Sequence, residues 1–369
     1  MGFLGPNELT ENVIQKNLCI GCGACMNLCP YFRSYRCKTA MLFPCTVSEG
    51  RCASFCPKIE VDLDYLSKQY FGNLFGASSL GHNISIMISQ KGKKIKNHTF
   101  QAGGTVSALI SFALKKKYIS SAILTDREGL LPIPRIITKD EDVFKCASTK
   151  YAAAPTLSAL NTAIGKGHSQ IGVVGTPCQT TAIAQMRTTQ STNKDPVGMV
   201  IGLFCTWALD YTQLEPFISQ QIETNKILKF DILPPPAEIM EIYTTDGKKH
   251  EISLDKIRKF IPATCSYCAD MTSEFSDISV GVLEGYPDKN TLIIRSEKGK
   301  MLVDEAEKEG YIIVDEIPEK SLEHLKTAAR QKRKRALLKA KEDGLLNATE
   351  DGKFSCIKLN SLSIEKITA

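Results

Sequence analysis

Short apolar runs alternate with amphipathic stretches through the middle of the chain. Runs rich in β-branched residues lie at residues 121–125, 170–174 and 198–204, and residues 106–117 and 156–166 between them have helical periodicity. The alternation begins near residue 84. Strands that alternate with helices predict an α/β domain whose sheet contains parallel segments. We expect this domain, built on a mixed sheet, to form the larger part of the fold.

A different pattern follows in the last third of the chain. The prolines at 234–236 predict a loop or a joint between subdomains. Residues 238–244 and 248–253 flank an Asp-Gly pair and predict a β-hairpin. Residues 291–295 predict a further strand, and the remainder of the chain is charged and helical in pattern.

Composition narrows the class of protein. The chain has 369 residues, of which 43% are hydrophobic and 23% charged, so it can bury a large core in two domains. Its fourteen cysteines occur mostly in spacings that suit thiolate ligation, which predicts a reducing cytoplasm. We see neither a secretory leader pattern nor an apolar run long enough for a membrane span, and we expect a cytoplasmic protein.

The net charge of +6 is modest for this length and gives no case for nucleic-acid binding. A local exception is the run from Lys332 to Arg335, within a basic stretch at residues 326–341 that has helical periodicity. One interpretation is a solvated helix face, the usual role of such runs. The other is contact with an acidic partner or with the polyanionic tail of a cofactor.

Eight of the fourteen cysteines lie between Cys19 and Cys56, in a segment with little apolar periodicity. The first four, Cys19, Cys22, Cys25 and Cys29, have the spacing C-x2-C-x2-C-x3-C-P. In this spacing three thiolates bind one 4Fe-4S cubane and the fourth cysteine commonly reaches a second cluster. We favour a 4Fe-4S site over zinc or a structural cysteine knot.

The next four cysteines are spaced less regularly but keep the x3-C-P ending. They are Cys37, Cys45, Cys52 and Cys56. We interpret them as a second ferredoxin motif widened by insertions. The crossed assignment gives Cys19, Cys22, Cys25 and Cys56 to one cluster and Cys29, Cys37, Cys45 and Cys52 to the other. The alternative is a decayed motif that holds no cluster.

Four more cysteines follow strand-like runs or lie in loop-like segments. They are Cys178, Cys205, Cys265 and Cys268. A CxxC pair alone is compatible with zinc, with redox dithiol chemistry or with chance. Ligands at the carboxyl ends of strands would converge in the crevice where α/β sheets bind cofactors. Cys146 and Cys356 are interpreted as plain thiols.

A glycine-rich segment precedes the first predicted helix. In Gln101-Ala-Gly-Gly-Thr-Val-Ser107 two glycines and two hydroxyl residues open an apolar helix. Exposed amides at a helix N-terminus attract phosphate oxygens, and glycine allows their close approach. An ordinary capped helix would produce the same pattern.

Several of these segments, in this order, resemble one known family. They are Gly103-Gly-Thr-Val-Ser-Ala-Leu109, Ser148-Thr-Lys-Tyr151, Val174-Gly-Thr-Pro-Cys-Gln179, Ile201-Gly-Leu-Phe-Cys205, Cys265-Ser-Tyr-Cys-Ala-Asp270 and Ser276-Asp-Ile-Ser-Val-Gly281. Together they are similar to the coenzyme F420 hydrogenase/dehydrogenase beta-subunit family, from Cys19 to about Gly310. That family includes beta subunits of deazaflavin-linked hydrogenases and formate dehydrogenases, and plant chlorophyll reductases.

The resemblance implies FAD in the α/β domain beside a 4Fe-4S cluster, with ferredoxin-type clusters in an N-terminal domain. It implies that Gly103, Gly104, Thr105, Ser107, Lys150 and Tyr151 line the FAD, and that Cys178, Cys205, Cys265 and Cys268 hold the cluster. We therefore expect a two-cluster ferredoxin-like domain at residues 1–75, an FAD and 4Fe-4S binding α/β domain at 76–310, and a charged helical extension at 311–369.

The expected activity is conversion of a two-electron carrier, reduced coenzyme F420, into one-electron current. FAD can accept a hydride and pass electrons singly to two or three 4Fe-4S clusters. The expected partner is a redox subunit of hydrogenase, formate dehydrogenase or heterodisulfide-reductase type, in a hetero-oligomer. Hydride transfer needs no general acid or base, and we nominate none. The alternatives are an adaptor that exchanges electrons only with ferredoxin or such a partner, a reductase of a small organic substrate, and a non-redox cluster protein.

Overall fold

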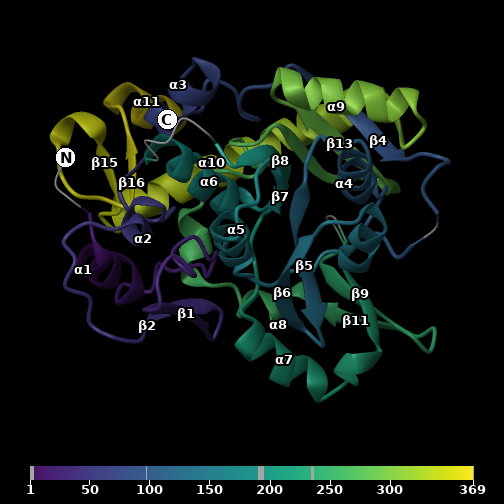
Figure 1. Cartoon of the computed structure of the whole chain (residues 1–369), viewed down its shortest axis with the longest axis horizontal. Helices are drawn as coiled ribbons and strands as arrows, with labels where there is room; N and C mark the ends of the chain where they lie inside the picture. Colours follow the sequence, from purple (N-terminus) through teal and green to yellow (C-terminus); the bar gives the residue numbers. More distant parts are fainter. Residues whose placement is uncertain (1–3, 97, 190–194, 234–236, 369) are drawn as a thin grey trace.

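The structure is a computed structural model, and it describes residues 4–96, 98–189, 195–233 and 237–368. The predicted loop at prolines 234–236 lies outside the described residues. Its centre is an eight-stranded sheet in the order β14-β4-β13-β12-β8-β7-β5-β6 (Figure 1). The strands are β14 (Ile312–Glu316), β4 (Ser85–Lys91), β13 (Tyr286–Ile294), β12 (Ile278–Leu283), β8 (Val197–Leu203), β7 (Ile171–Gly175), β5 (Ser121–Glu128) and β6 (Leu131–Ile137).

The sheet is mixed, as expected. Strands β12, β8, β7 and β5 run parallel to one another. Strand β13 is antiparallel to β12 and β4 is antiparallel to β13, so β4 points the same way as the four parallel strands. The outermost strands β14 and β6 are antiparallel to their neighbours. The carboxyl ends of β4, β7 and β8 therefore lie along one edge of the sheet.

Helices cover both faces of this sheet. Helices α4 (Thr105–Lys115) and α9 (Glu297–Lys308) pack on one face, and α5 (Thr156–Gly165) and α6 (Pro177–Thr189) on the other. Strand β5 shows the alternation that this needs, because Ala122 and Leu124 belong to the first core and Ile123 to the second. The predicted strands and helices of this domain are thus confirmed.

A smaller antiparallel sheet stands beside the large one. It contains β9 (Ile227–Ile232), β10 (Ile239–Thr244) and β11 (Lys249–Ser253), with α7 (Tyr211–Ser219), α8 (Leu254–Arg258) and the turn η3 (Thr224–Lys226) around it. The pair β10 and β11 is the predicted hairpin. Its core joins Leu214 and Ile218 of α7 to Met240 and Ile242 of β10.

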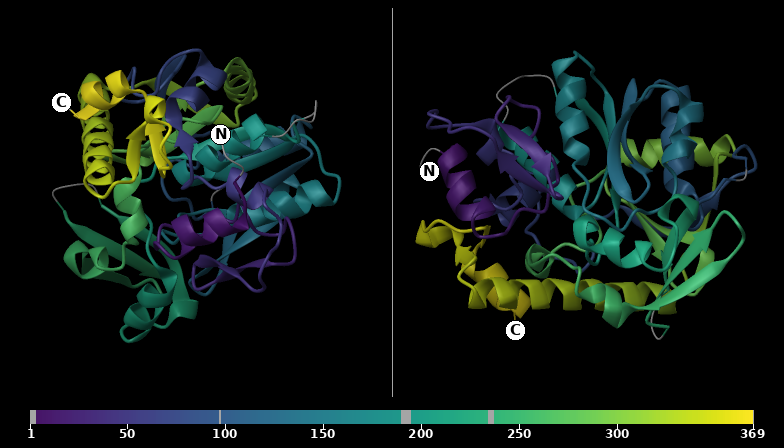
Figure 2. Two further views of the ribbon diagram at one scale, coloured as in Figure 1. Left: turned by 90° about the vertical axis from the view of Figure 1, so that its left-hand side faces the viewer. Right: turned by 90° about the horizontal axis from the view of Figure 1, so that it is seen from below.

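The cysteine-rich segment and the end of the chain share one core. The N-terminal elements are α1 (Pro6–Leu9), η1 (Thr10–Ile14), β1 (Phe32–Tyr35), β2 (Lys38–Met41), α2 (Arg51–Ser54), β3 (Val61–Asp62) and α3 (Leu63–Phe71). The C-terminal ones are α10 (Glu319–Glu342), β15 (Leu346–Ala348), η5 (Thr349–Asp351), β16 (Ile357–Leu359) and α11 (Ser361–Thr368). Strand β16 lies between β15 and β3, so the two ends of the chain are side by side (Figures 1 and 2).

The segment after residue 310 is therefore more than helical. Strand β14 forms an edge of the large sheet, and β15 and β16 extend the N-terminal unit. Between them α10 runs from the large sheet to the C-terminal strands (Figure 2, right). The solvated-face interpretation of this helix is wrong for Lys332 and Arg333, which are only 6% and 4% exposed. These residues lie on the inner face of α10 with Ala329, Ala336 and Leu337.

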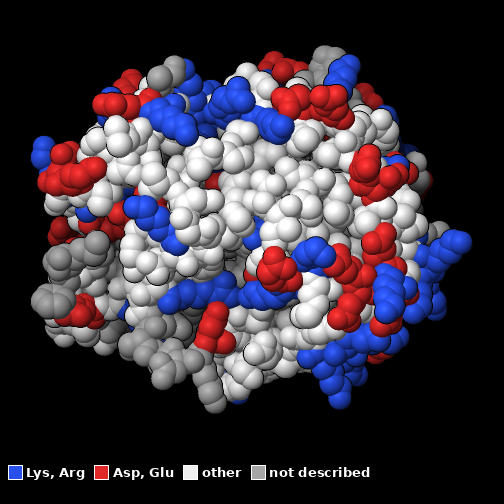
Figure 3. Space-filling model, turned by 90° about the horizontal axis from the view of Figure 1, so that it is seen from above, with Lys and Arg blue, Asp and Glu red and all other residues white. Residues whose placement is uncertain are grey.

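Other charged side chains are spread over the surface. On the face drawn in Figure 3, basic and acidic side chains are interspersed around a largely uncharged centre. Among the described residues, no helix is both long enough and apolar enough to cross a membrane.

Candidate iron-sulfur and cofactor site

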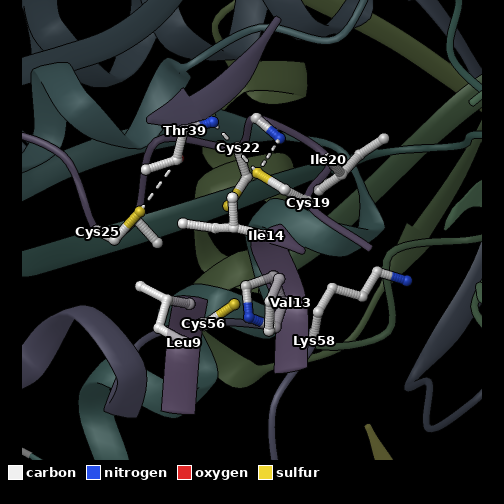
Figure 4. A pocket seen from close by; sticks show the side chains of 13 residues that line it. Leu9, Val13, Ile14, Cys19, Ile20, Cys22, Cys25, Thr39, Cys56 and Lys58 are labelled. Carbon is white, nitrogen blue, oxygen red and sulfur yellow. Dashed lines mark hydrogen bonds between the residues drawn. The ribbon is translucent and has the colours of Figure 1, made fainter. Parts of the chain in front are cut away.

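The first cysteine group surrounds a cavity in the N-terminal unit. Figure 4 shows Cys19, Cys22, Cys25 and Cys56 around this cavity, whose wall also includes Leu9, Val13 and Ile14. These are the four cysteines that the crossed assignment gave to one cluster, brought together although Cys56 is distant in sequence. Their role as ligands stays a prediction.

Backbone close to the thiols shapes this cavity. The amides of Gly21 and Thr39 donate to the Cys19 sulfur over 3.4 and 3.3 Å. Gly21 has φ of +67°, and a Cβ there would lie 2.0 Å from the Cys37 carbonyl oxygen, so only glycine fits. Donated N–H groups stabilise thiolate sulfur in iron-sulfur sites, and the loop supplies them.

The thiols of the first group are deeply buried. Burial raises the pKa of Cys25 to about 12, and it raises the pKa values of Cys22 and Cys56 well above the usual range. A coordinating metal deprotonates a thiol outright, which offsets that penalty. The residues present therefore fit a metal cluster better than they fit free reactive thiols.

Three cysteines of the second group lie near one another. Cys52 is influenced by the neighbouring thiols of Cys29 and Cys45, which places these three together. Cys37 instead accepts hydrogen bonds from the amides of Tyr211 and Thr212 in α7. It lies in the two-residue turn between β1 and β2, where both Arg36 and Cys37 have positive φ. Its role as the fourth ligand of this group stays a prediction.

The third group forms at the carboxyl edge of the large sheet. Cys178 opens α6 directly after β7, Cys205 follows β8, and Cys265 and Cys268 lie in or directly after the turn η4 (Ala263–Tyr267). The thiols of Cys268, Cys178 and Cys265 all act to raise the pKa of Cys205, after burial, so the four are neighbours. Burial likewise raises the pKa of Cys178 to about 11.

The first and third groups are adjacent. After burial, the strongest influence that raises the pKa of Cys22 is the Cys178 thiol. A hydrogen bond also joins the residues that precede Cys265 and Cys19, since the Thr264 hydroxyl donates to the Leu18 carbonyl over 2.6 Å. An electron held at one group would therefore have a short path to the other.

Two lysine side chains lie beside the third cysteine group. Their burial at this place was not predicted from the sequence. Lys332 of α10 donates to the carbonyl oxygens of Cys205 and Asp270 over 2.6 and 2.7 Å, and its Nζ lies 3.6 Å from the Cys268 sulfur. Lys58 donates to the Thr264 carbonyl over 3.3 Å. Both side chains are buried.

A single metal ion needs several ligands that converge on one point. In the part of the chain that the structure describes, no three His, Cys, Asp or Glu side chains converge closely enough to hold one ion. A cubane instead takes one thiolate on each of four irons, which needs the wider spacing of a cavity such as that of Figure 4.

The glycine-rich loop lies on the same edge of the large sheet as the third group. Gly104 begins α4 with φ of +75°, and α4 follows the carboxyl end of β4. Thr105 is buried, its hydroxyl pairs with that of Ser89 at 2.9 Å, and its amide donates to the Asn290 Oδ1 over 3.3 Å. These hydrogen bonds of Thr105 hold the loop against β4 and β13. Ser107 is half-buried in the first turn of α4.

Tyr151 and Thr149, on either side of Lys150, contact this loop through Gln101. The Gln101 amide donates to the hydroxyl of Tyr151 and to Asp231 of β9, and its oxygen accepts from the Thr149 amide. Lys150 donates to three carbonyls of its own loop, at residues 146–148, and burial lowers its pKa to about 8. Tyr151 is thus linked to the glycine-rich loop by Gln101, and the role of these residues in binding FAD stays a prediction.

A polar cavity of about 260 Å³ opens beside Lys150. Its wall includes His98, Thr99, Arg127 and Ser148. Ligand pockets commonly measure about 300–1,000 Å³, so this space suits part of a dinucleotide. Arg127, Lys145 and Lys150 line it together with Asp126, and basic side chains of this kind can bind phosphate.

A mixed α/β fold that carries ferredoxin-type cysteines and a glycine-rich helix opening is typical of an iron-sulfur redox protein. Residues 91–161 and 168–320 match the N-terminal and C-terminal family models of "Coenzyme F420 hydrogenase/dehydrogenase, beta subunit". Residues 12–31 match a 4Fe-4S binding domain. The chain belongs to the coenzyme F420 hydrogenase/dehydrogenase beta-subunit family, as the resemblance predicted.

Relatives support this assignment. The chain is 30% identical to one of the subunits of the F(420)H(2) dehydrogenase of Methanosarcina mazei, over 89% of this chain and 93% of that one. It is 27% identical to "Coenzyme F420-dependent sulfite reductase" of Methanocaldococcus jannaschii, over 83% of this chain and 49% of the relative. Its fold matches a chain of the F420-reducing [NiFe] hydrogenase complex of Methanosarcina barkeri with a TM-score of 0.66, at 24% identity and over 72% and 93% of the two chains.

Proposed function

We propose that the chain binds one FAD and passes electrons between reduced coenzyme F420 and a partner redox protein through 4Fe-4S clusters. The single observation that supports this most is the placement of the glycine-rich loop and the third cysteine group on one sheet edge, with the first group adjacent. With FAD bound at that loop and clusters at the two cysteine groups, this arrangement would form a continuous path to the N-terminal unit. Relatives whose names include F420 hydrogenase and F420-dependent formate dehydrogenase suggest the donor.

Each part of the chain has a defined task in this proposal. When bound, FAD supplies hydride acceptance and one-electron release. The amides and glycines that open α4 would hold its phosphates, and the loop of Lys150 and Tyr151 would line it. The third and first cysteine groups would hold clusters that relay single electrons, and the N-terminal unit would face the partner subunit in a hetero-oligomer.

Anaerobic purification tests this directly. We expect about twelve iron and twelve acid-labile sulfide per chain if all three groups hold cubanes, together with one FAD. Reduced F420 should then bleach the flavin absorbance. About eight iron would remove one cluster, and the irregular spacing of the second ferredoxin motif makes the second group the expected loss. Stoichiometric zinc without flavin would contradict the proposal.

Direct reduction of a small substrate is a second candidate. It is favoured by a relative named as a sulfite reductase. This chain matches about half of that relative's length. Turnover of a small organic or inorganic acceptor by the isolated chain, without a protein partner, would support this candidate over the first.

A further inference from the structure

The strongest unassigned feature is the pair of ammonium groups at the third cysteine group. Lys332 and Lys58 are each 6% exposed, and they approach the group from different parts of the chain. The acceptors of Lys332 are two carbonyl oxygens and the Cys268 sulfur, and that of Lys58 is the Thr264 carbonyl. Carbonyl oxygens solvate an ammonium group, but they do not neutralise its charge.

A buried charge is costly unless an opposite charge lies near it. Within the described residues neither ammonium group forms an ion pair with a carboxylate. Asp270, whose backbone carbonyl accepts from Lys332, uses its carboxylate oxygens to accept from the amides of Thr272 and Glu274 over 2.9 and 2.8 Å. Glu274 is paired with Arg333. Lys58 donates to the carbonyl of Thr264, the residue before Cys265, and it also lines the cavity of the first group.

We infer that Lys58 and Lys332 are the counter-charges of a 4Fe-4S cluster held by Cys178, Cys205, Cys265 and Cys268, and that they raise its reduction potential. This inference rests on the proposed function, which places a cluster there. Four thiolates and four sulfides outweigh the charge of the irons, so such a cluster is an anion, and each added electron makes it more negative. Two fixed cations beside it stabilise the reduced form more than the oxidised form.

The two lysines differ in what else they approach. Lys58 follows the Cys56-Pro57 pair and also lines the cavity of the first group (Figure 4). Lys332 contacts the third group from α10. Loss of the Lys58 charge should therefore lower the potentials of both clusters, whereas loss of the Lys332 charge should act mainly on the third. This difference separates an electrostatic effect from a general disturbance of the fold.

The experiment is an anaerobic redox titration of the full reconstituted chain, followed by electron paramagnetic resonance. The signal of the third cluster is identified by its absence in Cys268→Ala. In Lys332→Gln, which keeps a donor but loses the charge, the equilibrium constant for reduction of that cluster should fall at least about tenfold, which is about 59 mV for one electron. Lys332→Arg should stay within about threefold of the wild type.

Lys339→Gln is the matched control. It makes the same change on the same helix, at a side chain that is 44% exposed and paired with Glu342 and Asp343. Its cluster potentials should equal those of the wild type. Lys58→Gln should lower both potentials, and it decides the question if Lys332→Gln loses iron.

Two failures are distinguishable. Full iron content with unchanged potentials in Lys332→Gln or Lys58→Gln would overturn the counter-charge inference and leave the proposed function standing. A wild-type chain that holds no cluster at the third group, with no signal missing in Cys268→Ala, would overturn the proposed function itself.

Discussion

Gly104 shows how one residue can serve both the fold and a cofactor site. Its φ of +75° turns the chain into α4, and a Cβ there would lie 3.0 Å from the ring of Phe100. The same turn exposes the first amides of α4, which are the proposed phosphate ligands. A side chain at this position would therefore strain the backbone and obstruct the approach to those amides.

The corresponding prediction compares two glycines. Gly104→Ala should lower the affinity for FAD about tenfold or more, measured as flavin retained after anaerobic gel filtration. Gly129→Ala is the control, because Gly129 also has positive φ, of +58°, but a Cβ there meets nothing within 4 Å. Both variants should lose about 1 kcal/mol of stability from the backbone strain. Equal flavin retention in the two would show that the loop is merely structural.

At the scale of elements, the C-terminal strands complete the N-terminal unit. Strand β16 lies between β15 and β3, and Ile357 and Leu359 are buried among residues of the cysteine-rich segment. The Ile357 amide donates to the Leu345 carbonyl over 2.9 Å. The cavity of the first cysteine group therefore depends on residues from the opposite end of the chain.

Proline substitution in β16 tests this dependence. Ile357→Pro removes a ladder hydrogen bond and a buried side chain, which should cost about 3 kcal/mol or more. Iron bound by the N-terminal unit should fall while FAD is retained, measured by iron and flavin content with thermal unfolding. Lys353→Pro, at an exposed position in the loop before β16, is the control. Full iron content in Ile357→Pro would mean that the N-terminal unit assembles without the strand.

Local pattern predicted the elements that depend on local periodicity. Strands β5, β7 and β8, helices α4 and α5 and the β10–β11 hairpin all follow from spacing and turn residues. The sequence pattern also indicates the inner face of α10, because Ala329, Ala336 and Leu337 recur with helical spacing. Lys332 and Arg333 fall on that face, yet their charge favoured a solvated interpretation. Arg333 pairs with Glu274, and the inferred cluster would be the anion beside Lys332; a pattern along the chain reveals neither partner.

Contacts between segments that are distant in the chain could not be predicted from local sequence patterns. The pairing of β16 with β3 joins residues almost three hundred positions apart, and no local period encodes it. The grouping of Cys56 with the first three cysteines was predicted from the crossed ligation of paired ferredoxin motifs, and all four line one cavity. The contact of Cys37 with α7 was not predicted, since it joins a turn to a helix that is distant in sequence.

For the whole molecule, the central claim is a path from flavin through the third cysteine group to the first. Rapid anaerobic mixing of reduced F420 with Cys268→Ala, which retains FAD, tests it most directly. Flavin absorbance should bleach at nearly the wild-type rate, while no cluster signal changes. Cys22→Ala should keep reduction of the third cluster and lose only delivery to an external acceptor. Full cluster content and full transfer to the acceptor in Cys268→Ala would contradict the path.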